Sequence, residues 1–234
     1  MTSRIINQVK KLVLFDIDGT LIDRANGHVE AFAIAFREVY GVNASIHIIT
    51  PEGMTDQEII RAVLSKVGVA EGVIEAKMRE CMSVMVDFFT SIQPMLHIRL
   101  LPGVKEIIEH LHNEGYLIGL VTGNLEPIAR GKMQLAGLDR FISVGGFGSD
   151  AADRSDLVRR AIEQAQREHA LELGADIHLI GDAPQDVRAA LAGGAKPIGV
   201  TTGRYSKEEL TEAGASEVVP SLADQERLMD LLGG

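Results

Sequence analysis

The stretch LVLFDIDGT at residues 12–20 places four apolar residues directly before two aspartates that are two positions apart. An apolar run of this kind is typical of a strand buried on both faces, as in a parallel sheet. Further short apolar runs follow at 117–121, 142–144, 177–180, 197–200 and 218–219. Segments with helical periodicity lie between them, at 104–114, 125–136, 154–170, 184–192, 206–213 and 222–232. This alternation predicts an α/β protein with a doubly wound, Rossmann-like parallel sheet.

One long segment, residues 23–95, interrupts the alternation. It contains helix-period stretches at 28–40, 55–67 and 73–89, and no convincing buried strand. Thr55 and Glu58 have the spacing of a capping box at the start of the second stretch. About 70 residues of helix are too many for a simple crossover between two strands. We therefore predict one domain from residues 1–22 and 96–234, with residues 23–95 inserted as a helical domain.

Composition and charge exclude several classes of protein. The chain has 234 residues, with 33 acidic and 23 basic side chains and a formal net charge of −10. Such a chain is a poor ligand for phosphate backbones, so we expect no nucleic-acid partner. The lone cysteine, Cys81, excludes an intrachain disulfide and favours a reducing compartment. The apolar run at 12–15 is too short for a signal peptide or a membrane span. We expect a cytoplasmic protein without membrane association, either a monomer or a homodimer.

Polar residues follow three of the predicted strands. Asp16 and Asp18 end the first, residues 122–124 (Thr-Gly-Asn) end the second, and Asp182 and Asp186 follow the run at 177–180. In open α/β sheets, ligands bind beyond the carboxyl ends of the strands. Carboxylates gathered there repel one another unless a cation lies between them, and the start of a helix favours anions. The alternative is that these residues form ordinary turns and helix caps. Three such strand ends in one sheet favour a functional site.

The motifs DIDGT at 16–20, VTGN at 121–124 and GDAPQD at 181–186 resemble the first, second and fourth motifs of the haloacid dehalogenase superfamily. Their order and the helical insert after the first motif are similar to the branch that includes phosphoglycolate phosphatases and β-phosphoglucomutases. The resemblance covers nearly the whole chain. It implies a Rossmann-like catalytic core, a helical cap domain and a Mg²⁺-dependent phosphatase acting on a small phosphorylated metabolite, whose alcohol part the cap selects.

The resemblance also implies a role for each matching residue. Asp16 would be the nucleophile that forms an aspartyl-phosphate, and Asp18 the general acid and then the general base. Mg²⁺ would be held by the Asp16 carboxylate, the Asp18 backbone carbonyl and Asp182. Asp186 would orient a metal-bound water or support the metal ligands from behind. The transferring phosphoryl oxygens would contact the side chain and amides that follow the second strand, at Thr122, Gly123 and Asn124.

The third motif departs from the family pattern. The family usually has a lysine there, but residues 148–155 contain none. Arg154 is the best substitute, because it keeps the positive charge and can bind phosphate through two hydrogen bonds. Lys132 is the fallback, although it falls in the preceding predicted helix.

Several alternatives share parts of this pattern. A phosphomutase would need a further acid/base or cationic group in the cap, for which His28 is a candidate. A haloacid dehalogenase usually lacks the second aspartate of the first motif, so Asp18 argues against it. A receiver domain has about half this length and no helical insert. A non-catalytic phosphate-binding protein on the same fold would be expected to have lost Asp16 or Asp18.

Overall fold

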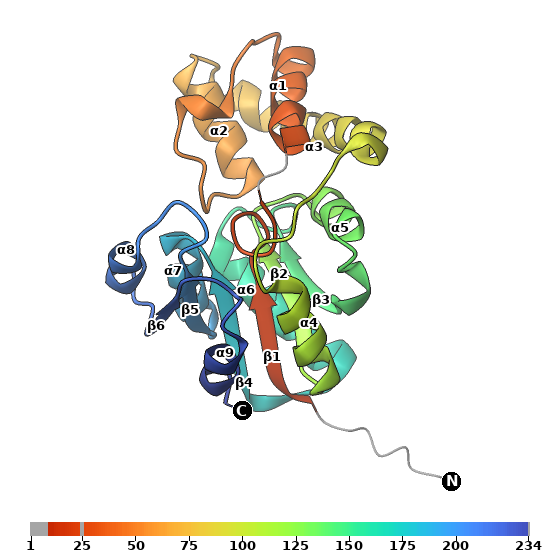
Figure 1. Ribbon diagram of the computed structural model, residues 1–234. Coiled ribbons are helices and arrows are strands. Elements are labelled where there is room, and N and C mark those ends of the chain that lie inside the picture. The colour runs from red at the N-terminus through yellow and green to blue at the C-terminus, as the bar shows by residue number, and fades with distance from the viewer. Residues whose placement is uncertain (1–8, 24–25, 234) are drawn as a thin grey trace.

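The computed structural model describes residues 9–23 and 26–233. Six parallel strands form one sheet in the order β3-β2-β1-β4-β5-β6 (Figure 1). The chain extends the sheet from β1 to β3 in one direction, and then returns to the other side of β1 with β4. The predicted doubly wound sheet is confirmed, and its topological switch point lies between β1 and β4. The strands are β1 (Val9–Phe15), β2 (Leu117–Thr122), β3 (Val144–Phe147), β4 (Leu171–Gly181), β5 (Lys196–Val200) and β6 (Glu217–Val219).

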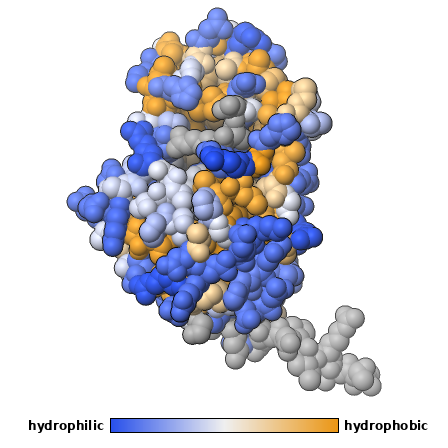
Figure 2. Space-filling view, in the orientation of Figure 1, coloured by the Kyte–Doolittle hydropathy of each residue, from blue (hydrophilic) through white to orange (hydrophobic). Residues whose placement is uncertain are grey.

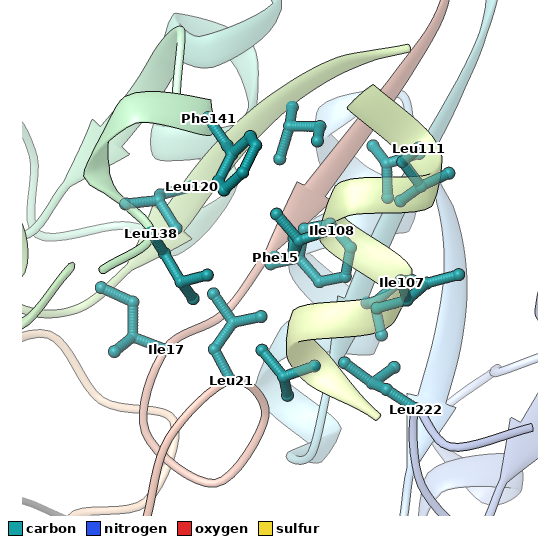
Figure 3. Close-up of a cluster of buried hydrophobic side chains, with 14 of the residues drawn as sticks. Phe15, Ile17, Leu21, Ile107, Ile108, Leu111, Leu120, Leu138, Phe141 and Leu222 are labelled. Carbon is teal, nitrogen blue, oxygen red and sulfur yellow. The ribbon is translucent and has the colours of Figure 1, made fainter. Parts of the chain in front are cut away.

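Strand β1 is buried on both faces because successive side chains point to opposite sides of the sheet. Val13 and Phe15 pack with α4 (Val104–Asn113) and α9 (Gln225–Leu231) on one face, as Figure 3 shows for Phe15 and α4. Leu12 and Leu14 pack with α6 (Arg154–His169) and α7 (Pro184–Gly193) on the other. All four side chains are fully buried. This double burial explains the unbroken apolar run before Asp16.

The remaining helices of the core are α5 (Glu126–Leu135) and α8 (Lys207–Glu212), with a 3-10 turn at Asp139–Phe141.

The inserted segment forms a helical lobe above the carboxyl edge of the sheet (Figure 1). It contains α1 (Asn26–Tyr40), α2 (Asp56–Lys66) and α3 (Glu71–Ile92), with 3-10 turns at Ile46–Ile48 and Gln93–Met95. These helices enclose a hydrophobic cluster of their own, which includes Phe36, Ile60 and Cys81. The predicted capping box is present at the start of α2. A helical cap on a Rossmann-like core is thus confirmed. The boundaries at 22/23 and 95/96 remain predictions, and residues 1–8, 24–25 and 234 within those ranges lie outside the described residues.

The third strand lies later in the chain than predicted. The apolar run at 142–144 suggested its position, but β3 spans Val144–Phe147. The two glycines in β3 hid the strand signal. A Cβ atom on Gly146 would lie 2.0 Å from the carbonyl oxygen of Leu157 in α6, so the close approach of α6 to the sheet requires glycine there.

The surface differs between the two lobes. In Figure 2, hydrophobic residues come to the surface mainly over the cap helices and near the junction of the lobes. None of the described helices combines the length and the apolar character needed to cross a membrane.

Candidate active site

The sheet topology brings two pairs of aspartates to one place. Asp16 and Asp18 follow β1, and Asp182 follows β4, the neighbouring strand across the switch point. Asp186 lies in the first turn of α7, two residues after Pro184 opens that helix. Parallel neighbours end at the same edge of a sheet, so residues about 165 positions apart in the chain become neighbours.

Three of these carboxylates form a compact buried group. Asp16, Asp182 and Asp186 are 7%, 4% and 2% exposed, and each offers an oxygen atom within 4.8 Å of the others. Asp186 also accepts a hydrogen bond from the backbone N–H of Ala183 at 3.1 Å, so it caps α7 as well. Hard carboxylate oxygens converging at this spacing are the donor set that Mg²⁺ prefers, and the group therefore fits that ion.

The raised pKa of Asp16 also supports a cation site at this group of carboxylates. Burial raises the pKa of Asp16 to about 7, repulsion from Asp186 and Asp18 adds to the rise, and Arg154 opposes it. The carboxylate is therefore held in surroundings that disfavour its charge. A divalent cation beside it would relieve this repulsion.

Arg154, the first residue of α6, reaches into the carboxylate group. Its Nη2 atom lies 2.5 Å from Oδ1 of Asp16 and 2.5 Å from Oδ1 of Asp186. The guanidinium is 8% exposed, and the two carboxylates raise its pKa against the opposing effect of burial. Its Nε atom is buried and has no hydrogen-bond partner in the described part of the chain. The arginine proposed for the third motif therefore contacts the nucleophile candidate.

Asp18 has different neighbours from the other three aspartates. Lys132 of α5 donates to both carboxylate oxygens, with Nζ 2.8 Å from Oδ1 and 2.6 Å from Oδ2, and Asn124 donates to Oδ2 at 3.0 Å. Burial alone would raise the pKa of Asp18, but the charge of Lys132 and these hydrogen bonds lower it. The group of three carboxylates does not include the Asp18 side chain. A metal contact through the backbone carbonyl of Asp18 stays a prediction.

Two cap residues extend the hydrogen-bond network that Asp18 forms with Lys132 and Asn124. His28 lies with Nδ1 3.2 Å from Nζ of Lys132 and Nε2 3.0 Å from Oδ2 of Asp56. Asp56 also accepts a hydrogen bond from the backbone N–H of Leu125 at 2.9 Å. Both His28 and Asp56 are buried. The network therefore joins the cap to the core beside Asp18.

The end of β2 and the two residues after it contact Asp18, Lys132 and the cap. Thr122 is fully buried, and its hydroxyl accepts a hydrogen bond from the backbone N–H of Asn124 at 3.3 Å. The carbonyl of Gly123 accepts from the backbone N–H of Asp56 at 2.8 Å. The amide side chain of Asn124 is bonded to Asp18 and Lys132. Its side-chain contacts therefore place Asn124 beside the acid/base candidate, and the phosphate contact expected at residues 122–124 stays a prediction.

The glycine of the first motif is required by the fold of the site. Gly19 has a φ of +93°, and a Cβ atom there would lie 2.5 Å from Oδ2 of Asp182. Its carbonyl accepts a hydrogen bond from the hydroxyl of Thr202 at 2.6 Å. Only glycine allows the loop after β1 to turn this tightly against the end of β4.

A cavity of about 550 Å³ lies between the cap and the carboxyl edge of the sheet. Its core side presents Asp16, Asp18, Asp182 and Arg154. Its cap side carries both apolar and polar side chains. The apolar ones are Val29, Phe32, Ile46, Ile49, Met54 and Ile59, and the polar or charged ones are His28, Glu30, His47, Glu52 and Asp56. The cavity can thus hold a charged group against the core, with apolar and polar cap side chains around the rest of a ligand.

Comparison with known proteins identifies the family. Residues 13–200 match the model of the haloacid dehalogenase-like hydrolases. The chain belongs to this family. This haloacid dehalogenase-like hydrolase is 26% identical to the "Probable phosphatase IndB" of Dickeya dadantii, with 92% of each chain covered. It is also 26% identical to a "Phosphoglycolate phosphatase" of Vibrio vulnificus, covering 95% of this chain and 96% of the relative.

A solved structure supports the same fold. The crystal structure of CbbY from Rhodobacter sphaeroides in complex with phosphate matches this hydrolase with a TM-score of 0.71 at 19% identity, covering 92% of this chain and 96% of the other. At that identity the likeness shows the fold.

Sequence reasoning missed the importance of Lys132 in this hydrolase. The buried face of α5 carries Ile128, Ala129, Lys132 and Met133, so a charged residue occupies a position where the helical period calls for an apolar one. A lysine on the buried face of a helix needs a buried partner. Its place on that face could therefore have indicated a functional or structural charge pair. The partner itself could not be named, because Asp18 lies 114 residues away in the sequence.

Proposed function

We propose that this hydrolase is a Mg²⁺-dependent phosphatase that hydrolyses a small phosphorylated metabolite through an aspartyl-phosphate intermediate. The observation that carries the proposal is the group of three buried carboxylates within 4.8 Å, with Arg154 in contact with Asp16 at the floor of the cavity. The family membership and the phosphatases among its relatives support the same reaction class.

The cation would be held by the Asp16 carboxylate, Asp182 and the backbone carbonyl of Asp18, with Asp186 behind them. When bound, Mg²⁺ neutralises the carboxylates and withdraws charge from the phosphoryl oxygens, so that a phosphate dianion can approach. Arg154, which lines the cavity, would supply a second positive charge beside the phosphoryl group.

The reaction then has two steps. An Asp16 carboxylate oxygen attacks phosphorus and the bond from phosphorus to the ester oxygen breaks. Asp18, which must enter this step in its protonated form, gives that proton to the leaving oxygen. Asp18 next takes a proton from water, which attacks the same phosphorus and displaces Asp16. The products are the alcohol and inorganic phosphate, and both aspartates return to their starting states. Thr122 and the adjacent amides would hold the phosphoryl oxygens.

The substrate is proposed to be small and to place its alcohol part against the cap. The cavity volume of about 550 Å³ suits a compact metabolite. The Vibrio relatives make phosphoglycolate one candidate. No feature of His28 favours a phosphomutase, because both of its ring nitrogens lie within hydrogen-bond distance of protein groups.

The decisive experiment compares Asp16→Asn with wild type on 4-nitrophenyl phosphate in the presence of Mg²⁺. We expect Asp16→Asn to lose hydrolysis while its circular dichroism spectrum stays unchanged, since the amide is not a nucleophile. Asp87→Asn, at an exposed position of α3, is the matched control and should keep wild-type turnover. Wild-type turnover by Asp16→Asn would refute the proposal. A panel of phosphorylated sugars, acids and nucleotides, followed for both phosphate release and isomerised product, would then name the substrate and separate a phosphatase from a mutase.

A further inference from the structure

We propose that Lys132 is a positioning residue that fixes the carboxyl group of Asp18 for proton transfer to and from the substrate. The inference rests on the proposed phosphatase function. It assigns a role to a residue that the family motifs quoted above do not contain.

The surroundings of Lys132 are unusual for a lysine. Its side chain is fully buried, on the face of α5 that also carries Ile128 and Met133. Burying an ammonium group costs several kcal/mol unless it is paired and hydrogen-bonded. The fold supplies three neighbours for its three N–H groups, namely Asp18, Asn124 at 2.6 Å and His28 at 3.2 Å. The ammonium therefore has a single well-defined position.

The chemistry of these groups fixes the direction of each hydrogen bond. A lysine ammonium only donates, so Nδ1 of His28 must accept from Lys132. The Nε2 atom of a neutral imidazole then carries the proton and donates to Asp56. Lys132 is thus held from the cap side by a histidine whose tautomer is set by Asp56.

The two oxygens of Asp18 are not equivalent in this arrangement. Among the described residues, Oδ2 accepts hydrogen bonds from Lys132 and Asn124, whereas Oδ1 accepts one, from Lys132. Each carboxylate oxygen has two lone pairs, so Oδ1 is the oxygen that keeps capacity for a substrate proton. The Asp18 side chain is 24% exposed and lines the cavity. Lys132 therefore holds both oxygens of the carboxyl group, Asn124 adds a second hydrogen bond at Oδ2, and Oδ1 keeps a lone pair for proton transfer.

If Lys132 positions Asp18, its removal should impair proton transfer in particular and not merely leave a buried charge unpaired. Without Lys132 the Asp18 side chain could occupy other staggered rotamers, and proton transfer depends strongly on the donor being in place. The loss should therefore appear where the leaving group needs a proton. A phosphate ester with a good leaving group, which departs as an anion, should be affected much less.

The test measures kcat/KM of wild type and Lys132→Met for phenyl phosphate and 4-nitrophenyl phosphate, two esters of similar size. Phenolate needs protonation far more than 4-nitrophenolate does. We expect Lys132→Met to lose at least about ten-fold more kcat/KM on phenyl phosphate than on 4-nitrophenyl phosphate. In an Asp18→Asn background, the same substitution should cause little further loss, because the two residues act through one group. Lys105→Met, at an exposed position of α4, is the control and should change neither ester.

The outcomes separate the two proposals. Equal losses on both esters, or additive losses in the double variant, would refute the positioning role. A wild-type protein that hydrolyses neither ester would instead refute the phosphatase function. If Lys132→Met does not fold, Lys132→Arg serves as the second variant, since it keeps the charge but moves the donors. It should show the same selective loss on phenyl phosphate, and uniform loss would again refute the inference.

Discussion

The guanidinium group of Arg154 lies 2.5 Å from Oδ1 of Asp16, although 138 residues separate the two in the sequence. The same nitrogen lies 2.5 Å from Asp186, so one cation neutralises two buried carboxylates. Removing one partner from a buried ion pair leaves the other charges uncompensated, which typically costs about 3–5 kcal/mol.

We therefore predict that Arg154→Met lowers the free energy of unfolding by about 3–5 kcal/mol in metal-free buffer at neutral pH. Arg154→Lys should lose less, because it keeps the charge but not the forked geometry. Urea denaturation measures both. Arg159→Met removes a half-exposed arginine of the same helix and should cost no more than about 1 kcal/mol. Equal losses at positions 154 and 159 would contradict the buried charge pair.

A thermal-shift measurement tests the metal site without relying on activity. Mg²⁺ should raise the Tm of the wild-type protein by roughly 5–10 °C at 100 times its Kd, because it binds the folded carboxylate group and not the unfolded chain. Asp182→Asn removes one of the three buried carboxylates and should abolish most of this shift. Excess chelator should reverse the shift in wild type. An undiminished shift in Asp182→Asn would place the cation elsewhere, and Asp87→Asn provides the control.

Gly123 offers a test of the contact between cap and core. A Cβ atom there would lie 2.2 Å from the carbonyl oxygen of Met54 in the loop before α2. Gly123→Ala should push this loop away and weaken the hydrogen bond from Asp56 to Gly123. We expect kcat/KM to fall by about ten-fold or more, because a misplacement of about 1 Å can cost far more than that.

The matched control for this substitution is Gly72→Ala in α3, where a Cβ atom would meet no neighbour within 4 Å. It should leave kcat/KM unchanged and stabilise the helix by up to about 1 kcal/mol. If both alanine variants keep full activity, the loop at Met54 is not needed for catalysis.

The raised pKa of the buried Cys81 thiol predicts that its reactivity differs between the native and the unfolded protein. Burial raises the pKa of Cys81 to about 12, with a further contribution from the charge of Asp56. Thiols react as thiolates, so the native protein should not react with a disulfide reagent at pH 8. In guanidinium chloride the pKa returns to about 8.5 and one thiol per chain should react rapidly. Rapid labelling of the native protein would show that the cluster around Cys81 opens readily.

The features of this protein that depend on local pattern could be predicted from the order of its residues. The apolar run 12–15 ahead of Asp16 encodes a strand buried on both faces, and the repeated alternation with helices encodes the parallel sheet. Because parallel strands end at one edge, the sequence also predicted that Asp182 and Asp186 would join Asp16.

The partner of each buried charge could be identified only from the packing of segments that are distant in the chain. Helical period placed Lys132 on a buried face, but only the packing of α5 against the loop after β1 and the cap brought it to Asp18 and His28. Likewise, the glycines of β3 weakened the apolar pattern of that strand, and only the close approach of α6 shows why glycine is required there. Local periodicity records which side of an element a residue occupies. It carries no information on what lies opposite, because that depends on contacts between segments far apart in the chain.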